Sequence, residues 1–281
     1  MRIARIIEYF PPHIGGMERH GLVLSQEQVK LGYEVEVFIG YSGNPKFDFR
    51  SPTSRSPEVG LQNPKLDFKI YKAPLQFLPL YSKARRFWFN FWAYRQVKKR
   101  HQKNPYDIIH LHGDFIEAYF GGKLSKKLSI PAVITIHAGL NKRFLKPKNA
   151  QYFKNIGKII CVSEEIKGDL EKIGIPKEKI TVISSGVYLF EFNNADENKI
   201  SELRNQYSKP ILISVGVLRT SKGHKYLIGA YKQLKQKYTS LSLIIIGDGP
   251  EKNNLEREAK GLDQVYFLGR QNHGKIVEYL K

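Results

Sequence analysis

The stretch Ile211–Gly223, with the sequence ILISVGVLRTSKG, constrains the fold of this chain more than any other feature. It opens after Pro210 as an apolar run, which is typical of a fully buried strand in a parallel sheet. A glycine, a short basic loop and Gly223 follow, and a helical pattern over 224–238 begins there. The pattern predicts a strand that turns through glycine into a helix.

Such a turn suits the binding of an anion. Free backbone N–H groups at a helix N-terminus stabilise negative charge, and Arg219 and Lys222 add side-chain cations at the same point. This chemistry fits a phosphate or a diphosphate. An ordinary βα turn with two solvated basic residues explains the stretch equally well, so both interpretations stay open on these residues alone.

The charge of the chain narrows the class of partner without choosing one. Its 281 residues carry a net charge of +20, with 46 Lys and Arg against 26 Asp and Glu. This excess favours nucleic acid, anionic lipid or a phosphorylated substrate, but no nucleic-acid-binding motif accompanies it. The single cysteine, Cys161, excludes an internal disulfide and is interpreted as a buried structural thiol.

Strand and helix patterns alternate along the chain, which is typical of doubly wound parallel sheets. The polar, weakly helical segment 190–208 is interpreted as a link. We therefore predict an α/β protein with an N-terminal domain over 1–188, a linker over 189–209 and a partial C-terminal domain over 210–281. The predicted strands lie at 3–7, 34–39, 68–72, 106–111, 132–136, 158–162, 179–183, 241–246 and 265–268 and in the run from 211.

A loop rich in proline and glycine follows the first predicted strand. Its sequence over Phe10–Gly16 is FPPHIGG, which continues neither a strand nor a helix. The loop lies at the C-terminal end of that strand, where open α/β sheets bind ligands. The adjacent Gly15 and Gly16 indicate a close backbone approach to a ligand, although a tight turn alone also explains Gly15. The G-x-G-x-x-G spacing of a dinucleotide site is absent.

Three histidines lie at or near predicted strand ends. His110 is expected to point into the sheet and to be structural. His112 and His137 lie at the ligand-binding edge and are the better candidates for chemistry. No cysteine or carboxylate has metal-ligand spacing to them, so we expect no metal site.

The segment 77–101 contains both tryptophans of the chain and is flanked by basic residues at both ends. Such a composition is typical of an interfacial helix on anionic lipid. A core helix whose aromatic side chains pack on the sheet is the alternative. The membrane interpretation is favoured because adjacent aromatic residues cannot all point one way. It assigns the membrane contact to Arg85, Arg86, Trp88, Phe91 and Trp92.

An ordered set of short motifs runs along nearly the whole chain: Gly15-Gly16, DIIHLH at 107–112, TIH at 135–137, CVSE at 161–164, SGV at 185–187, VGVLRTSKG at 215–223, IGDGP at 246–250 and FLG at 267–269. Together they resemble the GT-B fold retaining glycosyltransferases of family 4. The resemblance implies two Rossmann-like domains with parallel sheets that face a cleft. It also implies a nucleotide-sugar donor in the second domain, an acceptor in the first, and transfer that needs no metal or cofactor.

The resemblance also implies roles for single residues. Lys222, with Arg219 near it, should neutralise the donor diphosphate, and Gly16 should bring N–H groups to the same region. His137 should lie beside the transferred sugar or the acceptor hydroxyl, with His112 on the acceptor side. The loops of Gly247 and Gly269 should receive the base and ribose.

The chain departs from the family pattern in three places. Val217 stands where the family often has arginine, and Ser185 replaces a common asparagine. The sequence stops at Lys281, before the position of the family's paired-glutamate motif, E-x7-E. The family's last strands and crossing helix also lie beyond this position. The second domain is therefore expected to be incomplete, and this chain alone is expected to show little or no sugar transfer.

The function expected from these features is transfer of a sugar, with retention, to a lipid-linked or polysaccharide-precursor acceptor. The lipid part of this expectation rests on the aromatic-basic segment. No apolar run has the length of a transmembrane helix and no signal peptide is recognised. We therefore expect a cytoplasmic protein on the inner face of the membrane. A non-catalytic GT-B remnant, a subunit completed by a separate C-terminal partner, and a GT-B epimerase are the alternatives.

Overall fold

The computed structural model describes residues 1–11, 15–41, 67–74, 82–140, 142–186 and 192–281. They divide into a first unit that ends at Gly186 and a second unit that follows it. The boundary lies within two residues of the predicted one at 188. The predicted linker needs correction, because it contains helix α6 (Glu197–Asn205). Ile200 and Leu203 of α6 are buried, so this helix is a part of the second unit.

The described strands of the first unit form one parallel sheet in the order β3-β2-β1-β4-β5-β6-β7. The strand order reverses at β1, so the chain has a topological switch point between β1 and β4, and ligands bind at the carboxyl ends of strands at such a point. The strands are β1 (Arg2–Tyr9), β2 (Glu34–Tyr41), β3 (Lys69–Lys72), β4 (Ile108–His112), β5 (Ala132–Ile136), β6 (Lys158–Cys161) and β7 (Ile180–Val182).

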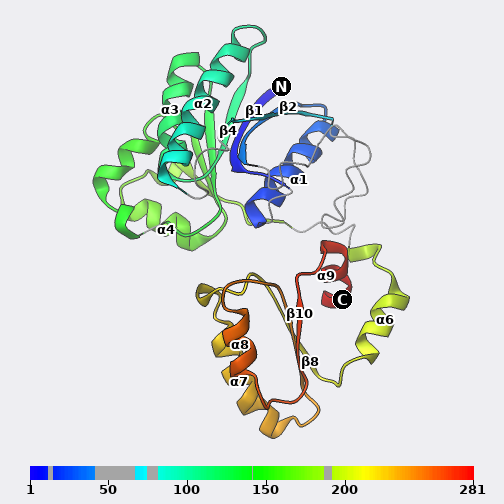
Figure 1. Ribbon diagram of the computed structural model, residues 1–281. Helices are drawn as coiled ribbons and strands as arrows, with labels where there is room; N and C mark the ends of the chain where they lie inside the picture. Colours follow the sequence, from blue (N-terminus) through cyan, green and yellow to red (C-terminus); the bar gives the residue numbers. More distant parts are fainter. Residues whose placement is uncertain (12–14, 42–66, 75–81, 141, 187–191) are drawn as a thin grey trace. The chain divides into compact units, whose positions relative to one another are not determined.

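Helices cover both faces of this sheet. Figure 1 shows α1 (Gly16–Lys30) on one face and α2 (Lys83–His101) with α3 (Phe115–Leu128) on the other. The two faces follow from right-handed crossovers that run in opposite directions from the centre of the sheet. The remaining helical elements of this unit are α4 (Glu164–Lys172) and the 3-10 turns η1 (Lys142–Phe144), η2 (Pro147–Phe153) and η3 (Lys177–Lys179).

Local chemistry explains where these helices begin and how closely they pack. Ser163 is the N-cap of α4 and accepts a hydrogen bond from the Ile166 N–H at 3.4 Å. α3 packs tightly against β4, because a Cβ added at Gly121 would lie 2.3 Å from the Leu111 side chain. The absence of a side chain at Gly121 therefore permits the close approach of α3 to β4.

The second unit contains a parallel sheet in the order β10-β9-β8. β9 is buried throughout, whereas β8 is half-buried. The expectation of a fully buried strand from Ile211 is therefore wrong, because among the described strands β8 pairs only with β9. The elements are β8 (Ile211–Val215), η4 (Thr220–Lys222), α7 (His224–Lys237), β9 (Ser242–Ile246), α8 (Lys252–Glu258), β10 (Val265–Gly269) and α9 (His273–Leu280).

Candidate active site

A cavity of about 720 Å³ opens in the first unit at the carboxyl ends of β1, β4 and β5. Glu8, His112 and Ile136 bring the three strand ends into its wall, and His137 follows β5 directly. This is the switch-point edge, and the volume is in the range of small-molecule sites, about 300–1,000 Å³. The chain therefore places a ligand-sized cavity where its topology predicts one.

Aromatic side chains make up a large part of the wall. The rings come from α2, α3 and the two 3-10 turns η1 and η2, and they include Phe87, Phe115, Tyr119, Phe120, Phe144 and Tyr152. They contact one another edge to face, as Phe87 does with Phe120 at a centroid distance of 5.3 Å. Aromatic residues spaced along one helix are expected in a core, so only the tertiary structure shows that these line a cavity.

Histidines form a cluster at the cavity's polar end. The Nδ1 atom of His112 and the Nε2 atom of His137 lie 2.9 Å apart and share a hydrogen bond. His20, from α1, packs against His137 with a ring centroid distance of 4.8 Å. Burial, with a smaller effect of His20, lowers the pKa of His137 to about 4, and burial holds the pKa of His112 well below its usual value. Both rings are therefore neutral near pH 7.

The expected roles of the strand histidines are partly settled by these contacts. His110 is buried, its Nε2 lies 2.8 Å from Thr135 Oγ1, and it does not line the cavity, so it is structural as predicted. His112 and His137 both line the cavity. Sequence spacing gave no sign of His20, because it comes from a helix far from them in the chain.

The cluster also bears on metal binding. One nitrogen each of His20, His112 and His137 lies within 4.8 Å of the other two, a separation at which three imidazoles can hold a metal ion such as zinc. The expectation of no metal site considered only cysteine and carboxylate partners and overlooked His20. The hydrogen bond between His112 and His137 uses two of the available nitrogen atoms without a metal.

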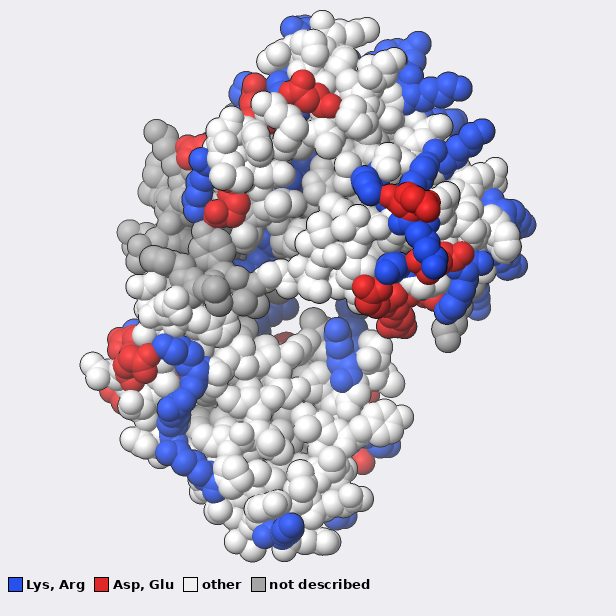
Figure 2. Space-filling view, turned by 180° about the vertical axis from the view of Figure 1, so that it is seen from behind, with Lys and Arg blue, Asp and Glu red and all other residues white. Residues whose placement is uncertain are grey.

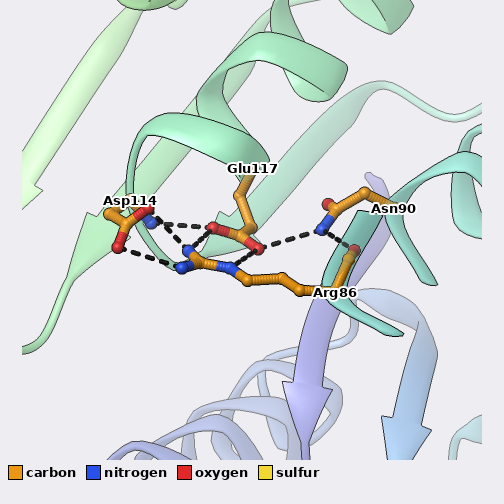
Figure 3. A network of polar contacts seen from close by, with 4 residues as sticks. All are labelled: Arg86, Asn90, Asp114 and Glu117. Carbon is orange, nitrogen blue, oxygen red and sulfur yellow. Dashed lines mark hydrogen bonds and ion pairs between the residues drawn. The ribbon is translucent and has the colours of Figure 1, made fainter. Parts of the chain in front are cut away.

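Three residues that line the cavity, Arg86, Asp114 and Glu117, form a partly buried ion network (Figure 3). Arg86 of α2 donates from Nε to Glu117 Oε1 at 2.8 Å and from Nη2 to Asp114 Oδ1 at 2.6 Å. Asn90 donates to Glu117 Oε1 at 2.9 Å. Although burial alone lowers it, the pKa of Arg86 is raised overall by the hydrogen bond and charge of Glu117 and then by Asp114.

Glu117 also fixes the start of α3. Its Oε2 accepts the backbone N–H of Asp114 at 2.9 Å, and Asp114 caps the helix in return. The D-x-x-E spacing at 114–117 is a sequence signal for this cap, but nothing in the local sequence assigns Arg86 to the same two carboxylates.

Glu8, near the end of β1, is a third carboxyl that lines the cavity, beside Asp114 and Glu117. Its side chain is 6% exposed, and its Oε1 has no hydrogen-bond partner among the described residues. Burial, and after it the charge of Glu117, raises the pKa of Glu8 to about 7. Near pH 7 the Glu8 side chain is therefore a mixture of the protonated acid and the carboxylate.

This raised pKa predicts a pH-dependent effect of Glu8→Gln. Between the unfolded pKa near 4.5 and the folded pKa near 7, the folded state binds more protons, so the wild type loses stability as pH rises through that window. We subtract the free energy of unfolding of the wild type from that of Glu8→Gln at each pH. This difference should be about 2–3 kcal/mol larger at pH 8 than at pH 4.5. Urea denaturation of both proteins at each pH measures this. Both proteins contain the same histidines, so the titration of these residues cancels in the comparison. If the stability difference between the two proteins were the same at every pH, the raised pKa of Glu8 would be contradicted.

In the second unit, three loops meet at the carboxyl ends of β8, β9 and β10. The Gly216 N–H donates to Ile246 O at 2.9 Å, and the Gly247 N–H donates to Gly269 O at 2.8 Å. The Leu218 N–H donates to Asp248 O at 3.0 Å. The predicted donor-binding positions Gly247 and Gly269 are thereby held together at one edge.

The basic turn before α7 lies at this same edge. Gly223 has φ 73° and caps the helix, and Arg219 and Lys222 are exposed around η4. α7 begins at His224, so its first N–H groups lack partners within the helix. The turn therefore has the cations and donors that an anion needs, as the sequence predicts.

The glycine pair after β1 behaves differently at its two positions. A Cβ at Gly15 would lie 2.1 Å from Glu18 Oε2, so the Glu18 side chain would have to move to make room for it. Gly16 begins α1 and has open space around it. The ligand roles predicted for Gly15 and Gly16 both stay predictions.

The membrane-facing residues predicted on α2 need correction. Arg85 is buried, with Nη2 donating to Gly40 O at 3.2 Å, and Arg86 belongs to the ion network. Trp92 is half-buried and packs on Phe38 with a centroid distance of 6.3 Å. Helical periodicity turns these three side chains away from the exposed face, so only Trp88 and Phe91 remain of the original set.

The exposed face of α2 is nonetheless aromatic and basic. It consists of Lys83, Phe87, Trp88, Phe91, Arg95 and Lys99, which we call the α2 face. Lys and Arg side chains line the side of the first unit where α2 and α3 lie, the right-hand edge of Figure 2 after its half-turn from Figure 1. No helix in the described part of the chain is long and apolar enough to cross a membrane.

Comparison with known proteins identifies the family. Residues 14–189 match the family model of glycosyltransferase family 4, and residues 195–281 match that of glycosyl transferases group 1. The chain belongs to glycosyltransferase family 4. The resemblance drawn from its ordered motifs is therefore confirmed.

Curated relatives of this family 4 protein include lipid glycosyltransferases. It is 24% identical to the alpha-monoglucosyldiacylglycerol synthase of Streptococcus pneumoniae, covering 100% of this chain and 64% of that protein. It is 23% identical to the GPI3 subunit of phosphatidylinositol N-acetylglucosaminyltransferase from Saccharomyces cerevisiae, covering 99% and 60%. The chain thus spans less than two thirds of the length of both relatives.

A solved structure confirms the fold class. Anabaena Alr3699/HepE, crystallised with UDP and glucose, superposes with a TM-score of 0.69 at 19% identity, covering 99% of this chain and 71% of that one. Both sheets of the family 4 chain are parallel and helix-covered, as in two Rossmann-like domains. The predicted α/β GT-B class is therefore correct.

Proposed function

We propose that this family 4 protein transfers a sugar, with retention of configuration, from a nucleotide-sugar donor to a lipid-linked or polysaccharide-precursor acceptor. The observation that carries the proposal is the aromatic cavity at the switch-point edge, with the neutral His112–His137 pair in its wall. The two lipid glycosyltransferases among its relatives support the acceptor class, and the match to two glycosyltransferase models favours a transferase over an epimerase.

The donor diphosphate is assigned to the basic turn of the second unit. Breaking the bond between the anomeric carbon and the diphosphate leaves negative charge on the departing phosphate, and fixed cations and backbone dipoles stabilise that charge. Lys222, Arg219 and the N-terminus of α7 supply both. The loops of Gly247 and Gly269 are assigned to the base and ribose. This charge stabilisation needs no metal ion or cofactor.

His137 is assigned to the reacting sugar or the acceptor hydroxyl. Because its ring is neutral near pH 7, it can orient a hydroxyl by a hydrogen bond without adding charge beside the donor. Its bond to His112 fixes the orientation of both rings. The attacking oxygen gains the anomeric carbon as the diphosphate leaves, and the hydroxyl proton passes to the departing phosphate.

A transfer assay tests the function. The 281-residue protein is incubated with radiolabelled nucleotide sugars and membrane extract, and the anomeric configuration of the product is determined by NMR. Label in lipid or polysaccharide with retained configuration supports the proposal. Binding of a nucleoside diphosphate with no incorporation would favour the non-catalytic alternative, in which the chain is a binding module or needs a completing subunit.

We expect Lys222→Ala to weaken nucleoside diphosphate binding by roughly 1.5–3 kcal/mol, the range for charge-assisted hydrogen bonds. Calorimetric titration of UDP, ADP and GDP measures it. Lys225→Ala is the matched control, because Lys225 is 72% exposed on α7 and pairs with Glu258. An equal effect of both substitutions would remove Lys222 from the site.

We also propose that the α2 face holds the protein on the inner, anionic surface of the cytoplasmic membrane. Exposed aromatic rings enter the headgroup region while Lys and Arg attract anionic lipid. Replacing Trp88 and Phe91 with serine should reduce cosedimentation with phosphatidylglycerol vesicles by at least about fivefold, and binding of the parent should weaken as salt rises. Both residues are exposed, so the variant should fold.

The control for this experiment is Tyr226→Ser, which removes an exposed aromatic ring from α7 in the second unit. It should cosediment like the parent. Equal binding by the α2-face variant and the parent would show that this face does not meet the membrane.

A further inference from the structure

The arginine that lines the cavity is paired with carboxylates of the protein itself. Of the described lining residues, Arg86 and Lys83 are the cations. Arg86 is bound to both Asp114 and Glu117, and Lys83 is exposed at the start of α2. The interior therefore offers no unmatched positive charge to a ligand, whereas Glu8 adds a carboxyl that gains charge above pH 7.

Two residues that line the cavity, Glu8 and His112, each have a buried polar atom that lacks a partner. Glu8 Oε1 and His112 Nε2 make no hydrogen bond among the described residues, and the side chains are 6% and 1% exposed. Leaving such a group unsatisfied costs about 1–3 kcal/mol, so each of the two atoms needs a partner, which a water molecule or a polar group of a ligand can supply. A hydroxyl suits both, because it donates and accepts.

Some of the aromatic residues that line the cavity are also exposed on the protein surface. Phe87 lines the cavity and is 49% exposed, and its ring lies 6.2 Å from that of Trp88 on the α2 face. Tyr119 likewise lines the cavity and is 38% exposed. One aromatic surface therefore runs from the buried polar atoms to the exposed face assigned to the membrane.

We propose that this cavity binds the uncharged, multiply hydroxylated headgroup of a lipid, a glycerol or a sugar, with its chain along the Phe87–Tyr119 wall, and that it rejects a phosphorylated headgroup. The inference rests on the proposed function and names the acceptor class of that site. Glu8 and His112 receive the hydroxyls, and the internally paired Arg86 leaves a phosphate without a counter-charge. Glu8 is thus a specificity-determining residue.

The test is calorimetric titration of the whole chain with two soluble lipids that differ by one group. Monooctanoylglycerol carries two free hydroxyls, and monooctanoyl-glycerol phosphate carries the same chain and glycerol with a phosphate. Both are used below their micelle concentration and without nucleotide. We expect monooctanoylglycerol to bind at least tenfold more tightly. Equal binding, tighter binding of the phosphate, or no binding of either lipid overturns the inference.

Variants at Glu8 locate the headgroup. Glu8→Leu should weaken monooctanoylglycerol binding at least fivefold, whereas Glu8→Gln, which keeps a hydrogen-bonding amide, should stay within about threefold of the parent. Glu165→Leu, an exposed position on α4, is the matched control and should bind like the parent. Unchanged binding by Glu8→Leu would place the headgroup elsewhere and overturn the assignment. If Glu8→Leu does not fold, the comparison of the two lipids on the parent still decides.

The lipid-binding experiment can succeed or fail independently of the tests of the proposed function. Lipid binding is measured without a donor, whereas nucleoside diphosphate binding and sugar transfer are measured independently. Transfer without the neutral-lipid preference refutes only this inference. Loss of diphosphate binding and transfer, with the preference intact, refutes only the proposed function.

Discussion

Replacing Arg86 with methionine will lower the free energy of unfolding of the first unit by about 3–5 kcal/mol, the cost of breaking a buried ion pair by removing one partner. The side chain of Glu117 is 2% exposed and that of Asp114 is 38% exposed, so the Glu117 carboxylate loses its counter-charge inside the protein. Urea denaturation followed by circular dichroism measures the loss.

Two further variants separate the ion network from the loss of a long side chain. Arg95→Met, on the exposed α2 face, should change stability by less than about 0.5 kcal/mol, as surface substitutions do. Adding Glu117→Gln to Arg86→Met should recover at least half of the loss, because glutamine removes the stranded charge and still accepts the Asp114 N–H. A loss below about 1 kcal/mol for Arg86→Met would show that the pairing contributes little to stability.

Gly247→Ala should destabilise the second unit by about 3 kcal/mol or more. Gly247 has φ 150°, a conformation that L residues rarely adopt, and an added Cβ would lie 1.8 Å from the Gly216 carbonyl oxygen. The backbone must move to relieve this clash, which separates the loops after β8 and β9. We therefore also expect weaker binding of nucleoside diphosphate, measured by calorimetry.

Gly229→Ala is the matched control for this change. Gly229 lies within α7, and a Cβ there meets nothing within 4 Å. Alanine should stabilise the helix by about 0.5–1 kcal/mol. Thermal unfolding that does not distinguish Gly247→Ala from the parent would mean that the three loops are not packed as described.

The edges of the two sheets where the strands end in glycine-containing loops were predictable because they depend on patterns that are local in the chain. A strand followed by glycine and a helix defines such an edge wherever it occurs, so the edges at Gly16 and Gly216 followed from short motifs. His112 and His137 were predictable for the same reason, since each ends a strand of the first sheet. Both line the cavity.

The neighbours of these residues were not predictable in the same way. Arg86 lies among aromatic and basic residues, a context that predicts an exposed membrane contact, yet it pairs with carboxylates about 30 positions away. His20 reaches His137 from another helix. Such pairings depend on how α1, α2 and α3 pack against the sheet. A short segment of sequence does not show how far its side chains lie in space from those of another element.

The sequence by itself determined the order of strands and helices, the position of the basic turn before α7 and the family, because apolar periodicity and glycine placement act through the local backbone. Only the tertiary structure decided which side of α2 faces water, which charges cancel and where unpaired polar atoms lie. These depend on contacts across elements, where burial makes an unpaired charge or hydrogen-bonding atom costly. Glu8 is an example: no sequence motif marked it, yet it lines the cavity and its buried Oε1 has no hydrogen-bond partner among the described residues.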